Sequence, residues 1–64
     1  MYELQLYYKD LTVRTFQEID YFQDAIEKMY LEMQNDYSIN KGVILDSATR
    51  TIVCISTFTF PNCY

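Results

Sequence analysis

Apolar residues recur at helical spacing in the middle of the chain, between two regions in which apolar and polar residues alternate. Apolar positions at intervals of three and four are typical of a helix that buries one face. We therefore predict a helix over residues 20 to about 35. The residues of its apolar stripe are Phe22, Ala25, Ile26, Met29, Tyr30 and Met33.

Two residues could begin this helix. The carboxylate of Asp20 could accept hydrogen bonds from the free amides of the first turn. Thr15 followed by Glu18 also fits a capping box, which would move the start of the helix back to Phe16. We favour Asp20, because residues 11–15 have a period of two and contain β-branched residues, as strands do.

The segment before the helix is typical of an antiparallel hairpin. Residues 2–8 alternate and are rich in strand-forming residues, and residues 11–16 resume the alternation after the short polar turn Lys9-Asp10. In this register the face beneath the helix carries Leu4, Leu6, Leu11 and Val13, with Tyr2 and Tyr8 beside them and with Tyr7 and Arg14 on the outer face.

The segment after the helix predicts a second hairpin. Residues 38–42 form the crossing loop, residues 43–45 and 51–58 are strands, and residues 46–50 turn the chain between them. The last strand could run to Phe60, because Pro61 has no amide to donate. The prediction is one small α+β domain over residues 1–64, in the order ββαββ, with an antiparallel sheet and one helix packed on one face.

A single helix leaves the other face of the sheet open. Both faces of the last predicted strand are apolar, and Tyr7 lies on the outer face of the first hairpin. We therefore expect an exposed apolar patch that includes Tyr7, Cys54 and Phe58, and we expect it to form a homodimer.

Charge is distributed unevenly along the chain. The whole chain carries −4, but residues 18–36 hold six acidic residues against Lys28 and so carry −5, which leaves +1 elsewhere. We expect this acidic ridge to repel nucleic-acid phosphates and to dock on a host or self protein with a basic surface. The alternative is an ordinary solvated helix face with Asp24–Lys28 and Lys28–Glu32 contacts. The predicted partner-binding residues are Asp20, Asp24, Glu27, Tyr7, Tyr21 and Phe58.

The sequence offers little for catalysis. It has no histidine, so Ser-His and Cys-His pairs are excluded, and its one glycine excludes a glycine-rich phosphate loop. Asp20, Asp24 and Glu27 could in principle gather Ca²⁺ or Mg²⁺ or act as an acid/base pair, but no loop or pocket completes such a site. We expect no enzyme activity, no metal and no cofactor.

The expected location of the chain bears on the state of its two cysteines. The N-terminus lacks the pattern of a signal peptide, and no apolar run is long enough to span a bilayer. We therefore expect a cytoplasmic chain with no membrane partner, in which Cys54 and Cys63 are free thiols rather than a disulfide.

A short acidic chain with the order ββαββ and no catalytic residues resembles the accessory proteins of phages and prophages, a class that includes anti-CRISPR and other host-inhibitor proteins. Residues encoded by AT-rich codons are also abundant, as in a low-GC bacterium or its phages. The resemblance implies a non-enzymatic inhibitor that occludes a host protein, with a nucleic-acid-binding groove as one target. The alternative is a structural homo-oligomer with no inhibitory role.

Overall fold

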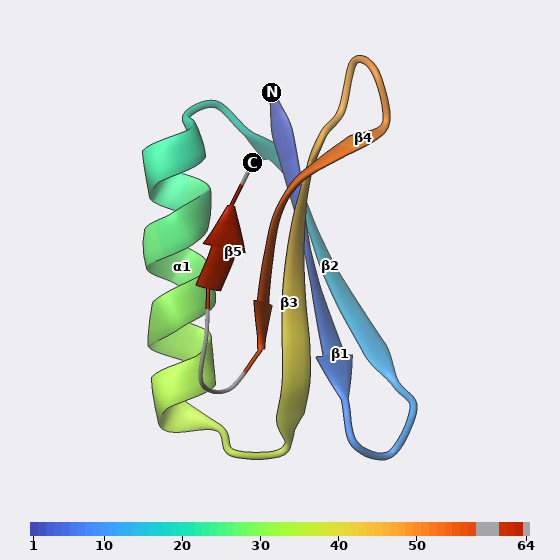
Figure 1. Cartoon of the computed structure of the whole chain (residues 1–64), viewed down its shortest axis with the longest axis vertical. Coiled ribbons are helices and arrows are strands. Elements are labelled where there is room, and N and C mark those ends of the chain that lie inside the picture. The colour runs from blue at the N-terminus through green and yellow to red at the C-terminus, as the bar shows by residue number, and fades with distance from the viewer. Residues whose placement is uncertain (58–60, 64) are drawn as a thin grey trace.

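The computed structural model describes residues 1–57 and 61–63 and contains an antiparallel sheet and one helix (Figure 1). The predicted α+β class and the order ββαββ are confirmed, and a short additional strand follows. The strands pair in the order β2-β1-β3-β4-β5. The elements are β1 (Tyr2–Tyr8), β2 (Val13–Ile19), α1 (Phe22–Asn35), β3 (Ile39–Asp46), β4 (Thr51–Thr57) and β5 (Pro61–Cys63).

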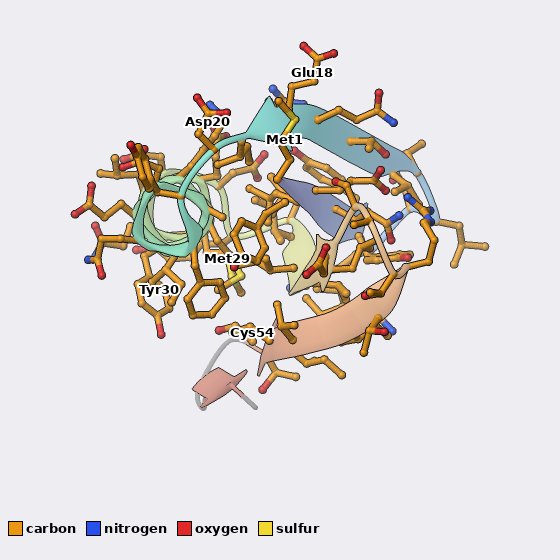
Figure 2. All side chains as sticks on the ribbon, turned by 90° about the horizontal axis from the view of Figure 1, so that it is seen from above. Met1, Glu18, Asp20, Met29, Tyr30 and Cys54 are labelled. Carbon is orange, nitrogen blue, oxygen red and sulfur yellow. The ribbon has the colours of Figure 1, made fainter. Side chains whose placement is uncertain are left out.

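Helix α1 lies on one face of the sheet, over β1, β2 and β3, and Figure 2 shows the sheet curving around that side. The predicted apolar stripe faces the sheet, although Ile26 and Phe22 are only partly buried and Tyr30 at its border is 37% exposed. The buried cluster between the two layers consists of Leu4, Leu6, Ala25, Met29, Met33, Ile39, Ile44 and Cys54.

The first hairpin differs from its prediction by one residue in register. Its loop spans four residues rather than two, because Leu11 adopts a left-handed conformation with a φ of 73°. The Tyr8 amide donates to the Thr12 carbonyl, and the Leu11 amide donates to the Tyr8 carbonyl. A shift of one residue moves every side chain of a strand to the other face.

Three predicted positions are therefore wrong. Leu11 is 91% exposed at the loop, and Val13 pairs with Tyr7 on the open face, 47% exposed. Arg14 pairs with Leu6 and lies on the helix side rather than on the outer face. Phe16 pairs with Leu4 and takes the core position that the shift makes available.

The predicted helix caps are also wrong. The residue at the N-cap position is Tyr21, and no side chain caps the helix there. Strand β2 continues to Ile19 because Glu18, with a φ of 60°, forms a bulge that returns Ile19 to the core side. Thr15 thus lies within β2, and Asp20 lies in the short connection that follows.

The end of the chain differs from prediction in two respects. Pro61 begins the short strand β5, which pairs with β4, instead of only stopping a strand. Cys54 is fully buried and disulfide-bonded, so the prediction of free thiols is wrong. Its neighbour in the register is Cys63, the only other cysteine of the chain. The predicted strand end at Phe60 lies outside the described residues.

Candidate functional site

Four of the six predicted partner-binding residues lie along one side of the molecule. Asp20, which Figure 2 labels, and Tyr21 occupy the connection before α1. Asp24 and Glu27 are exposed on the side of the helix away from its buried residues, as predicted. Tyr7 lies on the opposite face of the sheet and does not join them. Phe58 lies outside the described residues.

Part of the predicted acidic ridge is occupied by contacts within the chain. Glu32 pairs with Arg14 at 3.6 Å, and Asp36 accepts hydrogen bonds from the hydroxyl and the amide of Ser38. These bonds, that of the hydroxyl first, hold the pKa of Asp36 below its ordinary value. The acidic surface thus contracts to Glu18, Asp20, Asp24 and Glu27.

Lys28 does not make the ion pairs with Asp24 and Glu32 that belong to the alternative of an ordinary solvated helix face. Its Nζ lies 4.4 Å from the centre of the Phe16 ring, and the Arg14 guanidinium lies 5.0 Å from the same ring. The electron-rich face of this ring on β2 therefore attracts both Lys28 of the helix and Arg14 of the same strand. Glu27 accepts a hydrogen bond of 3.3 Å from Nε2 of Gln23, four residues earlier in the helix.

Two large apolar side chains lie among these carboxylates. Leu31 is 59% exposed, and Tyr21 is 70% exposed. Leu31 follows Glu27 by four residues and Asp24 by seven, so the three side chains lie on the same side of the helix. Sequence reasoning missed Leu31 because it considered only the buried stripe. We call the set Asp20, Tyr21, Asp24, Glu27 and Leu31 the acidic helix face.

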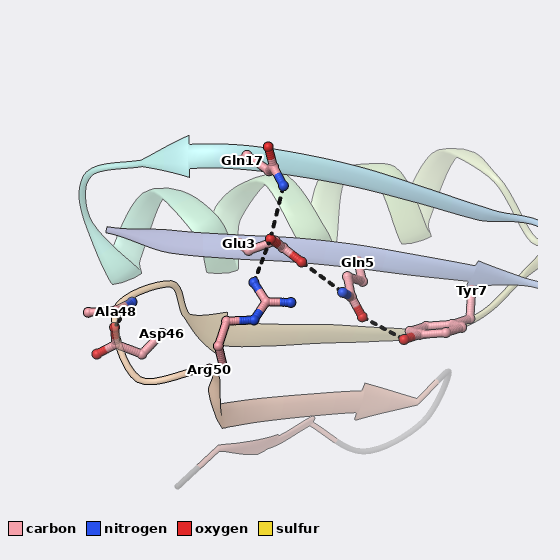
Figure 3. Close-up of polar contacts among 7 residues, drawn as sticks. All are labelled: Glu3, Gln5, Tyr7, Gln17, Asp46, Ala48 and Arg50. Carbon is pink, nitrogen blue, oxygen red and sulfur yellow. Dashed lines mark hydrogen bonds and ion pairs between the residues drawn. The ribbon is translucent and has the colours of Figure 1, made fainter.

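The open face of the sheet is organised around a buried carboxylate (Figure 3). Glu3 is only 4% exposed, and it accepts hydrogen bonds from Gln5 at 2.7 Å, Arg50 at 3.1 Å and Gln17 at 3.2 Å. The bonds from Gln5 and Arg50 are the main causes of a pKa below the ordinary value. The Tyr7 hydroxyl extends this network by donating to Gln5.

Around this network, little apolar surface of the open face is exposed to solvent. Val43 and Leu45, which lie beside Gln5 and Glu3 in the register, are each 5% exposed, and Lys41 lies over the Tyr7 ring. Among the described residues of this face, the exposed large apolar side chains are Val13 and Ile52. The chain therefore covers most of the apolar surface that the sequence predicts to be exposed here.

Two further results concern metal ions and membranes. Within residues 1–57 and 61–63, no group of three or more acidic or cysteine side chains could hold a metal ion. In the same part of the chain, no helix is long and apolar enough to cross a membrane. Comparison of the chain with protein-family models, curated proteins and solved structures finds no match.

Proposed function

We propose that this chain is a small non-enzymatic protein-binding module whose acidic helix face docks on a basic surface of a partner protein. The observation that carries the proposal is the exposure of Leu31 and Tyr21 among carboxylates that are not paired with cations of the described chain. Protein interfaces commonly combine a few apolar anchors with a charged rim. The acidic helix face has both components.

Charge favours a basic partner over nucleic acid. Asp20, Asp24 and Glu27 would repel phosphates, whereas lysines and arginines of a partner would gain from their proximity. A protein surface that binds nucleic acid is rich in such residues. An inhibitor or regulator of the phage type, which occludes a nucleic-acid-binding groove of a host protein in the cytoplasm, is the form of this function that we propose.

A structural homo-oligomer without an inhibitory role is the second candidate. It is favoured by Leu11 and Val13, which are exposed apolar residues at one edge of the sheet, away from the acidic helix face. The two candidates differ in the surface that they use, so substitutions in one surface separate them.

Affinity capture from the lysate of a low-GC bacterium tests the first candidate. The native chain and the Asp24→Lys/Glu27→Lys variant are used as baits, and both substitutions are at exposed positions. We expect the native chain to retain a basic protein that the variant loses, and we expect the retained protein to bind nucleic acid more weakly in the complex. Equal retention by both baits would contradict docking through the acidic helix face.

A further inference from the structure

Strand β2 is an open edge of the sheet. It spans Val13–Ile19, and no strand of the described residues pairs with its outer side. The opposite edge is β5, which has three residues and begins with a proline that has no amide to donate. A long edge strand offers its free backbone groups to another strand, whereas a short edge with proline is protected. The regular part of β2, before the bulge at Glu18, is thus open to extension.

Exposed apolar side chains lie at both ends of this strand. At its beginning Leu11 is 91% exposed and Val13 is 47% exposed, and just beyond its end Tyr21 is 70% exposed. Leu11 holds a left-handed backbone conformation that bulky residues rarely adopt. A large apolar side chain kept in this conformation in water is unfavourable, and contact with another molecule would remove it from water.

Charge differs between the same two ends. The end at Ile19 carries the exposed carboxylates Glu18 and Asp20. The end at Val13 is neutral, because its three cations balance its three carboxylates, one of which, Glu32, pairs with Arg14. The charged residues at the Val13 end are Lys9, Arg14, Lys41, Asp10, Glu32 and Asp36.

We infer that β2 pairs antiparallel with β2 of a second copy of this chain, about a two-fold axis near Thr15. Antiparallel pairing places the beginning of one β2 beside the end of the other. Leu11 and Val13 of one copy then lie near Ile19 and Tyr21 of the other, and the acidic end of each copy lies near Lys9 and Arg14 of its partner copy. Two-fold pairing uses the same edge twice, so the assembly closes as a dimer.

The dimer leaves much of the acidic helix face accessible. Asp24, Glu27 and Leu31 lie on the outer side of α1, whereas the pairing uses the edge of the sheet. One dimer would therefore present two such faces, which would strengthen binding to a partner that has two basic sites. The dimer does not depend on the proposed docking function, because neither needs the other to form.

Sedimentation equilibrium from low micromolar to near-millimolar concentration tests the pairing. For the native chain we expect a transition from the monomer mass of 7.7 kDa toward twice that mass. Thr15→Lys places two like charges next to the two-fold axis and should weaken association about tenfold or more. Thr57→Lys is the matched control, since Thr57 is an exposed strand threonine on the same sheet face in β4. It should associate as the native chain does.

Leu11→Asn gives a second test that does not endanger the fold. Asparagine tolerates the left-handed conformation better than leucine, so the loop should form at least as well, while the apolar contact across the dimer is lost. We expect normal thermal unfolding of the monomer and weaker association. A native chain that stays monomeric throughout the range would overturn the pairing. Association that Thr15→Lys and Leu11→Asn leave unchanged would also overturn it.

Discussion

Gly42 of β3 lies directly beneath Met29 of α1, so closely that a Cβ atom at position 42 would be 2.7 Å from both Cγ and Sδ of Met29. Gly42 is the only glycine of the chain, and its φ is not in the left-handed region. The position therefore needs glycine for its small volume rather than for its conformational freedom. This contact fixes how closely the helix approaches the middle of the sheet.

Replacing Gly42 by alanine should destabilise the fold. The added methyl group forces Met29 to move in a fully buried layer, and overpacking of this kind costs about 1 to 3 kcal/mol, which exceeds the gain from a stiffer unfolded chain. Urea unfolding measures the difference. Met29→Ala should cost less in the Gly42→Ala background than in the native chain, because the two residues are in contact. Gly42→Ala with native stability would contradict the close contact.

The core side of the helix should be far more sensitive than its outer side. Met29→Ala should lower the free energy of unfolding by about 2 to 5 kcal/mol, because Met29 is fully buried and its truncation leaves a cavity. Ile26→Ala should cost less, since Ile26 is only partly buried. Leu31→Ala is the control and should change thermal stability little. A large loss for Leu31→Ala would show that Leu31 is part of the core.

Acid should weaken the link that Glu3 makes across the sheet. Hydrogen bonds from Gln5 and Arg50 lower the pKa of Glu3 below its ordinary value of 4.5. The ionised carboxylate therefore stabilises the fold fully above that value, and this stabilisation is lost as the pH falls through the lowered pKa. The difference in unfolding free energy between the native chain and Glu3→Gln should shrink from neutral pH to about pH 3.

The acid dependence that Glu3 causes must be separated from that of Asp10 and Asp36. Hydrogen bonds from Thr12 and Ser38 lower their pKa values too, so they lose stabilisation in the same direction. The Asp10→Asn/Asp36→Asn variant should keep the part of the acid dependence that Glu3 causes. A difference between the native chain and Glu3→Gln that stays constant with pH would show that the Glu3 carboxylate does not contribute in this way.

Reduction should weaken the attachment of the last strands. Cys54 is disulfide-bonded and fully buried in β4, and a disulfide that closes a short loop typically contributes about 2 to 3 kcal/mol. A dithiol reductant should lower the melting temperature of the native chain and should have no effect on Cys54→Ser. Equal melting of the native chain with and without reductant, after the thiols are shown to be reduced, would contradict this contribution.

The sequence predicts the parts of the fold that depend on hydrophobic period. The stripe that includes Ala25, Met29 and Met33 defines the helix and its buried side, and the alternation on either side defines the hairpins. The register of the first hairpin could not be predicted, because it depends on a leucine in a conformation that glycine or asparagine usually adopts. One residue of error there reversed the faces of Val13 and Arg14 and placed Leu11, a loop residue, in the core.

The surface also has features that the sequence predicts and features that it does not. Exposure of Asp24 and Glu27 follows from the helical stripe and is confirmed. The covering of the open face could not be predicted, because the bond from Arg50 to Glu3 joins residues 47 positions apart. Long-range polar contacts of this kind have no local pattern in the sequence. Only the folded chain therefore shows that its own side chains cover most of the apolar surface of the open face.

The association rate with a captured partner is the most direct test of docking through the acidic helix face. Asp24→Asn/Glu27→Gln and Thr51→Lys/Thr57→Lys both raise the net charge of the chain from −4 to −2, but the second pair lies on β4. Exposed charges attract over about 8 Å at physiological ionic strength, so their position matters as well as their sum. We predict that Asp24→Asn/Glu27→Gln slows association and reduces its salt dependence, while Thr51→Lys/Thr57→Lys stays near the native rate. Equal rates for the two variants would contradict docking through this face.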